Sequence, residues 1–164
     1  MTPALRIGHG YDAHRLVPRR GLILGGVEIP FHLGLDGHSD ADVLTHAIMD
    51  AMLGALALGD IGKHFPPQDG SFKGADSIGL LRKVIAMVKT EGFALSNLDA
   101  TIIAQKPRLA GFIPQMRENI AAATQVPVNH ISVKATTEEG MGFTGRQEGI
   151  AAHCVVLLVR DSRT

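Results

Sequence analysis

The C-terminal stretch at positions 149–160 constrains the fold more than any other part of the chain. Between Ile150 and Val159 every side chain except His153 is apolar, so the segment has no polar face to turn toward water. A strand of this kind is typical of a sheet that is covered on both faces. Cys154 lies within the same run, and we expect a buried thiol there because the chain has no second cysteine to pair with it.

Extended and helical segments alternate through the rest of the chain. Strands are expected at positions 5–14, 22–29, 97–105, 130–136 and 149–160. Helices are expected from position 39 or 40 to about 58, at 77–91 and at about 111–124, the last one beginning near Pro114. The segment 60–74 contains Pro66-Pro67 and Asp69-Gly70, which are typical of a loop.

This order of elements predicts an α+β fold with a mixed β-sheet and helices packed on one face. If helices cover only one face, the apolar strands must bury the other face against another subunit. No repeat, linker or low-complexity segment divides the chain, so residues 1–164 are expected to form a single domain. A chain of this length can bury roughly 70% of the surface that its unfolded form exposes, enough for a core without disulfides.

Composition argues against two classes of partner. Sixteen basic and sixteen acidic residues give a formal net charge of zero, and aromatic residues are only 4% of the chain, so no nucleic-acid surface is expected. No segment reaches the roughly 18 apolar residues of a membrane span, and the N-terminal residues lack the pattern of a secretory signal. We therefore expect a cytoplasmic protein that binds no membrane.

A metal site is suggested near the N-terminus. Alternate side chains of a strand share a face, so Asp12 and His14 should point the same way, and His46 would join them from a helix. Three ligands of mixed nitrogen and oxygen type leave a fourth tetrahedral position open, as in catalytic zinc sites. Alternatively, Asp42, His46 and Asp50, which recur every four residues, form an ordinary solvated helix face.

Two further segments carry groups suited to phosphates. The loop at 134–146 combines hydroxyls, adjacent carboxylates, glycines and a cation, which could bind phosphates and a divalent ion or could form an ordinary turn-rich loop. The segment 104–109 ends a predicted strand with Lys106 and Arg108, which could meet a diphosphate or lie in solvent.

The combination of these segments is far more specific than any one of them. The stretches GHGYDAHR, HSDADVLTHAIMDA, DATIIAQKPRL, IPQM and KATTEEGMGFTGR occur in this order. Together they closely resemble the 2-C-methyl-D-erythritol 2,4-cyclodiphosphate synthase family of the non-mevalonate isoprenoid pathway. The resemblance extends over almost the whole chain.

The resemblance implies a reaction and its metal ions. The substrate would be 4-diphosphocytidyl-2-C-methyl-D-erythritol 2-phosphate, whose 2-phosphate attacks the β-phosphorus, expels CMP and closes the cyclodiphosphate ring. Asp12, His14 and His46 would bind one divalent metal, usually zinc, and Glu139 would bind a magnesium or manganese ion between the substrate phosphates. His38 and Thr137 match the positions that stabilise the transition state.

The resemblance also implies which residues bind the substrate. The metal end of the pocket corresponds to Asp12, Ala13, His14 and His38. The methylerythritol pocket corresponds to Ser39, Asp60, Ile61 and Gly62, and a neighbouring loop to Phe65, Pro66, Pro67, Gln68 and Asp69. The cytidine and diphosphate pocket of the adjacent subunit corresponds to Ala104, Gln105, Lys106, Pro107, Arg108, Leu109 and Ala110, with Thr136, Thr137, Glu138 and Glu139.

The assembly implied by the resemblance is a homotrimer, in which the sheets of three subunits form the core and active sites lie between subunits. Phe143 and Arg146 match positions of a central cavity that can hold an isoprenoid diphosphate. Two positions depart from the usual pattern: Arg108 replaces a common Lys, and His153 stands where some relatives have Glu. The acidic partner of Arg146 is then expected to be absent or replaced by Glu148.

Two other classes of function remain compatible with the residues alone. A zinc-dependent phosphodiesterase would use an activated water on the same metal site. A trimeric module that binds CMP or isoprenoid diphosphates would hold the metal for structure only.

Overall fold

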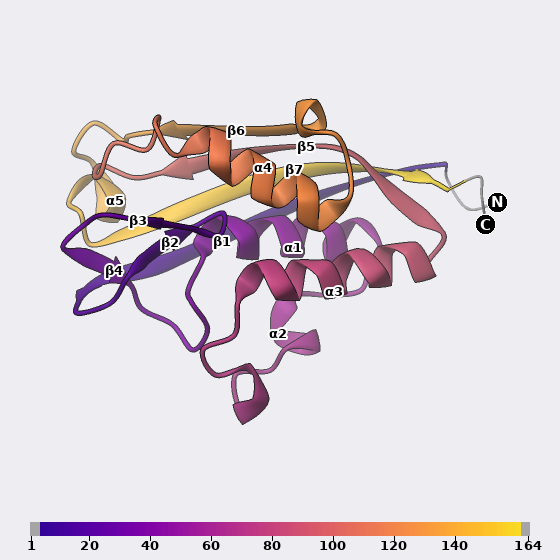
Figure 1. Cartoon of the computed structure of the whole chain (residues 1–164), viewed down its shortest axis with the longest axis horizontal. Coiled ribbons are helices and arrows are strands. Elements are labelled where there is room, and N and C mark those ends of the chain that lie inside the picture. The colour runs from indigo at the N-terminus through magenta and orange to yellow at the C-terminus, as the bar shows by residue number, and fades with distance from the viewer. Residues whose placement is uncertain (1–3, 162–164) are drawn as a thin grey trace.

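A computed structural model describes residues 4–161 of the chain. Five strands form the main sheet in the order β4-β1-β7-β5-β6, and a separate hairpin pairs β2 with β3 (Figure 1). The strands are β1 (Leu5–Pro18), β2 (Leu22–Leu24), β3 (Val27–Ile29), β4 (Leu33–Leu35), β5 (Phe93–Ile103), β6 (Ile131–Thr136) and β7 (Gly149–Arg160). The α-helices are α1 (Val43–Ala55), α2 (Ile61–His64), α3 (Ser77–Thr90), α4 (Ile113–Thr124) and α5 (Gly142–Gly145), and the 3-10 turns are η1 (Gly70–Phe72) and η2 (Val128–His130).

The predicted α+β fold with a mixed sheet is confirmed. The apolar C-terminal strand β7 lies in the middle of the sheet, antiparallel to β1 on one side and to β5 on the other. Strand β6 pairs with β5 in parallel, and β4 pairs with β1 antiparallel. The prediction that helices cover one face is also confirmed, because α1 packs on β1 and β7, α3 on β5, and α4 on β6 (Figure 1).

Glycines allow α1 to lie unusually close to β1. A Cβ atom added to Gly8 would come within 1.8 Å of the Ala51 carbonyl oxygen, and one added to Gly10 within 1.9 Å of the Ala47 oxygen. Real Cβ atoms never come so close, so only glycine fits at these two positions. Asp12 and His14 lie on the same face of β1 as Gly8 and Gly10. The close contact therefore also places Asp12 and His14 in front of the first turn of α1.

The opposite face of the sheet is open in the single chain. Ile7 on β1 is 74% exposed and Val155 on β7 is 47% exposed. Leu5 and Tyr11, which lie on the same face of β1 as Ile7, are also exposed. Within residues 4–161, strand β7 is therefore covered on its helix side only, and these residues do not supply the cover of the other face that the sequence predicts.

Several predicted boundaries are wrong for identifiable reasons. The strand expected at 22–29 is a hairpin, because Gly25 and Gly26 both take positive φ values, 57° and 69°, and form a tight turn. Strand β4 was not predicted, and the segment 60–74 contains the short helices α2 and η1. Strand β1 continues to Pro18, past the predicted end. The first long helix begins at Val43 instead of position 39 or 40.

The solvated helix face suggested for Asp42, His46 and Asp50 is also wrong. Asp42 is fully buried and His46 is only 7% exposed. Asp42 caps α1 by accepting hydrogen bonds from the backbone and hydroxyl of Thr45, and it also accepts from the backbone N–H groups of Gly25 and Gly26. One carboxylate thus joins the N-terminus of α1 to the β2–β3 turn, and burial raises the pKa of that carboxyl.

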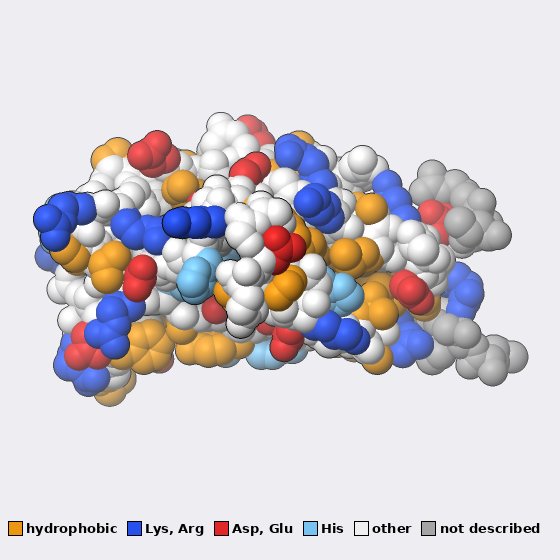
Figure 2. All heavy atoms as spheres, turned by 90° about the horizontal axis from the view of Figure 1, so that it is seen from below, with side chains coloured by type: hydrophobic (Ala, Val, Ile, Leu, Met, Phe, Trp, Pro, Cys, Tyr) orange, Lys and Arg blue, Asp and Glu red, His pale blue; other side chains and the backbone are white. Residues whose placement is uncertain are grey.

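The face seen from below in Figure 2 carries both Lys and Arg side chains and Asp and Glu side chains. Within residues 4–161, no helix has both the length and the apolar character needed to cross a membrane.

Asp42 provides a test of this packing. The substitution Asp42→Ala leaves several buried N–H donors without an acceptor, so we expect the free energy of unfolding to fall by about 3 kcal/mol. Asp76 caps α3 at an exposed position, and Asp76→Ala should cost only about 1 kcal/mol. Urea unfolding of both variants at one protein concentration makes the comparison. Equal losses would contradict the role assigned to Asp42.

Candidate metal centre

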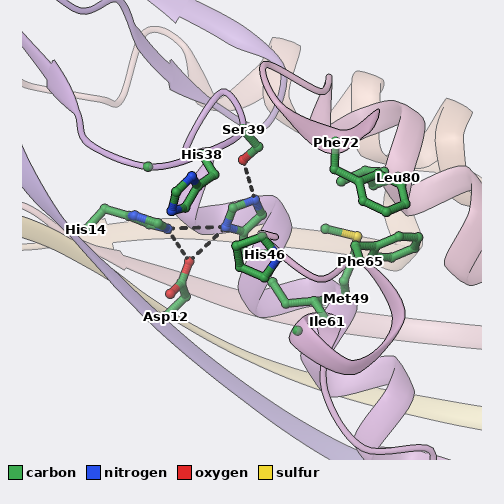
Figure 3. A pocket seen from close by; sticks show the side chains of 13 residues that line it. Asp12, His14, His38, Ser39, His46, Met49, Ile61, Phe65, Phe72 and Leu80 are labelled. Carbon is green, nitrogen blue, oxygen red and sulfur yellow. Dashed lines mark hydrogen bonds and ion pairs between the residues drawn. The ribbon is translucent and has the colours of Figure 1, made fainter. Parts of the chain in front are cut away.

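Asp12, His14 and His46 lie together where β1 passes the first turn of α1 (Figure 3). Asp12 and His14 follow Gly8 and Gly10 on the face of β1 that α1 covers, as the alternation of side chains predicts. The Asp12 Oδ2 atom is 2.8 Å from His14 Nε2 and 3.1 Å from His46 Nδ1. The two imidazole nitrogens are 3.3 Å apart.

Hydrogen bonds on the outer side of each imidazole orient the two rings. His14 Nδ1 lies 2.7 Å from the backbone oxygen of Asp36, which can only accept, so Nδ1 carries a proton and, in the neutral ring, Nε2 has the lone pair. His46 Nε2 lies 3.0 Å from the hydroxyl of Ser77, on the side away from Asp12. Such outer partners are typical of metal-ligating histidines, because they fix the ring and its tautomer.

The electrostatics of the cluster favour a cation at its centre. Burial raises the pKa of Asp12, but the neighbouring imidazoles of His14 and His46 outweigh it and bring the pKa to about 2. For His14, burial lowers the pKa, while the hydrogen bond and charge of Asp12 raise it above its ordinary value on balance. Without a metal, a proton on His14 would balance the carboxylate.

The three side chains fit a metal ion. One ligand atom from each residue lies within 4.8 Å of the others, and all three belong to types that divalent metals accept. Three protein ligands leave room for a further ligand from outside the protein. The predicted grouping of Asp12, His14 and His46 is therefore present as a candidate metal-binding triad.

A pocket of about 220 Å³ opens beside the triad (Figure 3). Its polar end is formed by the three candidate ligands and the loop from Gly37 to Ser39, which places His38 next to His14 and His46. Its other end is apolar and is lined by Met49, Ile61, Phe65, Phe72 and Leu80. A small cavity with a few converging polar groups and apolar walls is the usual form of a small-molecule site.

The structure places the other predicted pocket residues unevenly. Ile61, Gly62, Phe65 and Pro67 line the pocket, whereas Asp60, Pro66, Gln68 and Asp69 do not. Asp60 caps α2 and is exposed. Asp50 accepts a hydrogen bond of 2.8 Å from the Ile61 backbone N–H, which fastens α2 to α1. Burial raises the pKa of the Asp50 carboxyl.

Several residues of the pocket were missed from the sequence. Met49 lies three positions after His46 in α1, so helical spacing could have found it. Phe72 and Leu80 come from η1 and α3, and no local pattern connects either of them to the triad.

Arg20 was missed as well, although it holds the loop that carries His38. Its guanidinium donates to the backbone oxygens of Gly37, at 2.6 Å, and Ser39, at 2.9 Å, the two neighbours of His38. The same guanidinium lies 3.7 Å from a carboxylate oxygen of Asp36. Arg20 thus fixes the backbone on both sides of the His38 side chain.

The segments 104–110 and 136–140 form a second cluster at one end of β5 and β6. The Ala104 N–H donates to the Thr136 oxygen at 3.0 Å, and the Gly140 N–H donates to Gln105 Oε1 at 3.1 Å. The Thr137 hydroxyl lies 3.4 Å from Glu139 Oε1. Among the described residues that line the pocket beside the triad, none belongs to either segment. Within one chain, the second cluster therefore does not contribute to the pocket beside the triad.

The predicted cavity residues lie on a third part of the surface. Phe143 lines another hollow with Ala13, His14 and Glu148, so this hollow adjoins the triad. Arg146 Nε is 3.0 Å from Glu148 Oε1, so Glu148 is an acidic partner of Arg146 in this chain. His153 Nδ1 is 3.0 Å from His9 Nε2 on the open face of the sheet.

Fold and site together define a class of protein: an α+β protein in which a long strand and a closely packed helix hold a His-His-Asp triad beside a small pocket. The family model described as the YgbB family matches residues 5–159. The chain belongs to this family.

Curated relatives match the chain over nearly its whole length. A 2-C-methyl-D-erythritol 2,4-cyclodiphosphate synthase from Trichlorobacter lovleyi is 66% identical over 155 residues, which cover 94% of this chain and 99% of that protein. The enzyme of the same name from Geotalea uraniireducens is 64% identical over 156 residues, 95% of this chain and 99% of the relative.

Solved structures confirm the fold. A CDP complex of IspF from Plasmodium falciparum has a TM-score of 0.88 at 31% identity, covering 99% of this chain and all (100%) of that chain. The bifunctional IspDF from Campylobacter jejuni has a TM-score of 0.92 at 44% identity and covers 95% of this chain. This chain spans 42% of the length of that bifunctional protein.

The raised pKa of His14 predicts how metal binding depends on pH. Below that pKa the metal-free imidazole is protonated, so a metal ion must displace a proton, and affinity should rise with pH through the neutral range. The expected slope is about one logarithmic unit of affinity per pH unit on the acid side of the pKa. Titration with Co²⁺ across this range measures it. An affinity that does not change with pH would contradict the proton balance of the triad.

The contacts of Arg20 predict that its removal affects the loop at the pocket and leaves the metal ligands in place. The substitution Arg20→Ala frees the backbone around His38, so turnover should fall roughly ten- to a hundredfold because the loop is no longer held in position. Metal content should stay near the wild-type value. Steady-state kinetics and metal analysis test this, with Arg19→Ala as the control in the same turn. Wild-type turnover in Arg20→Ala would show that the loop needs no such support.

Proposed function

We propose that this chain converts 4-diphosphocytidyl-2-C-methyl-D-erythritol 2-phosphate into 2-C-methyl-D-erythritol 2,4-cyclodiphosphate and CMP, acting as a phosphorus–oxygen lyase in isoprenoid biosynthesis. The observation that carries the proposal is the metal triad at the polar end of a pocket, in a chain whose relatives with over 60% identity bear this enzyme's name. The cytoplasmic location stays a prediction.

The reaction is an intramolecular substitution at phosphorus. An oxygen of the 2-phosphate attacks the β-phosphorus, the bond from that phosphorus to the bridging oxygen breaks, and the electron pair leaves with CMP. Atoms balance without water. The rate of such a step is increased mainly by orienting the reacting groups and by neutralising their negative charge.

Zinc is the metal that we propose for Asp12, His14 and His46, where it would neutralise phosphate charge and help to orient the phosphate. The His38 imidazole, held beside the triad, would donate a hydrogen bond to a phosphate oxygen. The apolar side chains of Ile61 and Phe65 would exclude water, so that the 2-phosphate attacks in place of hydroxide.

The second cluster supplies the other half of the proposed site. Thr137 would donate to the transferring phosphate, and Glu139 would hold a magnesium or manganese ion between the α- and β-phosphates. Cytidine and diphosphate would bind along 104–110, with Lys106 and Arg108 as cations. Arg108 in place of Lys offers a planar fork of donors in place of a single ammonium. Ser39 and Asp60 would bind the hydroxyls of the methylerythritol end.

A homotrimer would unite the two clusters. Two observations support it: the open apolar face of the sheet, and the separation of the second cluster from the metal pocket within one chain. The open sheets would form the trimer core, and the segments 104–110 and 136–139 of one subunit would complete the pocket of the next. Phe143 and Arg146 would line a central cavity for an isoprenoid diphosphate, with His153 where some relatives have Glu and Glu148 as the acidic partner of Arg146.

Phosphorus NMR of the authentic substrate tests the reaction, run in water enriched in oxygen-18. We expect the cyclodiphosphate and CMP to appear together without label. Label in the products would instead identify a phosphodiesterase that activates water. Tight binding without release of CMP would identify a binding module.

Substitution of Glu139 tests the proposed role of this residue in binding the second metal ion. Glu139→Gln keeps the shape of the side chain but removes its charge, so we expect turnover to fall at least about a hundredfold and to require more magnesium. Zinc content should not change, because Glu139 lies outside the triad. The matched control is Glu118→Gln on α4. A magnesium dependence equal to that of the wild type would refute the role of Glu139.

A further inference from the structure

Behind the metal triad, a hydroxyl and a carboxylate line up with His46. His46 Nε2 lies 3.0 Å from Ser77 Oγ, at the start of α3. Ser77 Oγ in turn makes a short hydrogen bond to Asp40 Oδ1. Ser77 is fully buried and His46 nearly so, which shields the contact between them from water, and Asp40 is half-buried.

The direction of each proton in this chain follows from what the groups can donate. The Asp40 carboxylate accepts from the backbone N–H groups of Ser77, at 3.0 Å, and Asp42, at 3.2 Å. A carboxylate has no proton to give, so the Ser77 hydroxyl donates to it. The lone pairs of Ser77 Oγ then face His46, and the proton between them belongs to His46 Nε2.

The position of this proton determines which nitrogen of His46 can bind a metal. A neutral imidazole with its proton on Nε2 has its lone pair on Nδ1. Nδ1 is the atom 3.1 Å from Asp12 Oδ2 and 3.3 Å from His14 Nε2. The outer chain therefore leaves His46 with the ligand atom that the triad needs.

We propose that Asp40 and Ser77 are positioning residues that form a carboxylate–hydroxyl–imidazole relay, which holds His46 in its Nε2–H tautomer and strengthens its Nδ1 as a metal ligand. The inference rests on the metal role given to His46 under the proposed function and extends it to residues outside the pocket. Asp40 and Ser77 would not touch the substrate.

A nearby hydroxyl shows why Ser77 is the specific partner. Ser39 Oγ is 3.2 Å from the same His46 nitrogen, but it is not bonded to a carboxylate. It accepts from the Ala41 N–H at 3.1 Å, and its own proton is free to turn toward or away from the ring. Only Ser77 has its proton committed elsewhere, so only Ser77 must accept from His46.

The relay also connects α3 to the metal centre. Asp40 binds both the backbone and the hydroxyl of Ser77, and its own N–H donates to the Ala75 oxygen at 3.2 Å. The loop before α1 and the N-terminus of α3 are thereby joined directly behind His46. The outer partner of His14 is the neutral backbone carbonyl of Asp36. The outer partner of His46 is the Ser77 hydroxyl, which is itself hydrogen-bonded to the Asp40 carboxylate.

Zinc affinity, measured by competition with a chromogenic chelator, is the first test. Ser77→Ala should weaken zinc binding by roughly ten- to a hundredfold, the usual effect of losing an outer partner of a metal ligand. Ser39→Ala should weaken it less. Thr90→Val, which removes an exposed hydroxyl at the other end of α3, should leave affinity unchanged. Circular dichroism shows whether each variant folds.

The tautomer of His46 is the second test, and it uses the wild-type chain. Nitrogen-15 NMR of the zinc-free protein at mildly alkaline pH should find the His46 proton on Nε2. In Ser77→Ala the proton should move toward Nδ1, where Asp12 can accept it. A proton on Nδ1 in the wild type would overturn the relay even if the Ser77 variant failed to fold.

The two tests separate the relay from the function on which it rests. If the wild type binds no zinc, the metal role of the triad is wrong, and the tautomer measurement still decides the relay. If the wild type binds zinc and Ser77→Ala binds it equally well, the relay is wrong and the proposed function stands.

Discussion

The close contact between α1 and β1 is the constraint on which the site depends. Gly8 and Gly10 let the backbone of the helix rest on the strand, where any Cβ atom would collide with the Ala51 and Ala47 carbonyl oxygens. Asp12 and His14 continue the same face of β1, and His46 stands on the first turn of α1. The distances of about 3 Å within the triad are possible because strand and helix already touch.

Around this contact, polar groups that are far apart in the sequence form hydrogen bonds with one another. Asp42 caps α1 and binds the turn between β2 and β3, Arg20 holds the loop around His38, and Asp36 accepts from His14. The bonds of Arg20 and Asp36 orient groups that line the pocket, namely the loop around His38 and the ring of His14. These bonds hold the loop and the His14 ring in position, which suits a reaction whose rate depends mostly on orientation.

The sequence predicts what depends on local spacing. Alternation along β1 places Asp12 and His14 together, and the apolar run of β7 identifies the central strand of the sheet. Tertiary partners leave no local pattern, so the burial of Asp42 and the placement of Ser77 behind His46 could not be read in advance. The roles of Thr137 and Glu139 came from resemblance alone, and they stay proposals because this chain holds them apart from the triad's pocket.

The central claim is that β1 and α1 together bind one metal through Asp12, His14 and His46. Anomalous diffraction at the zinc edge, on crystals of the zinc-loaded protein, tests it most directly. We expect one zinc peak per chain, coordinated by Asp12 Oδ2, His14 Nε2 and His46 Nδ1. A peak elsewhere, or coordination through His14 Nδ1 or His46 Nε2, would contradict it.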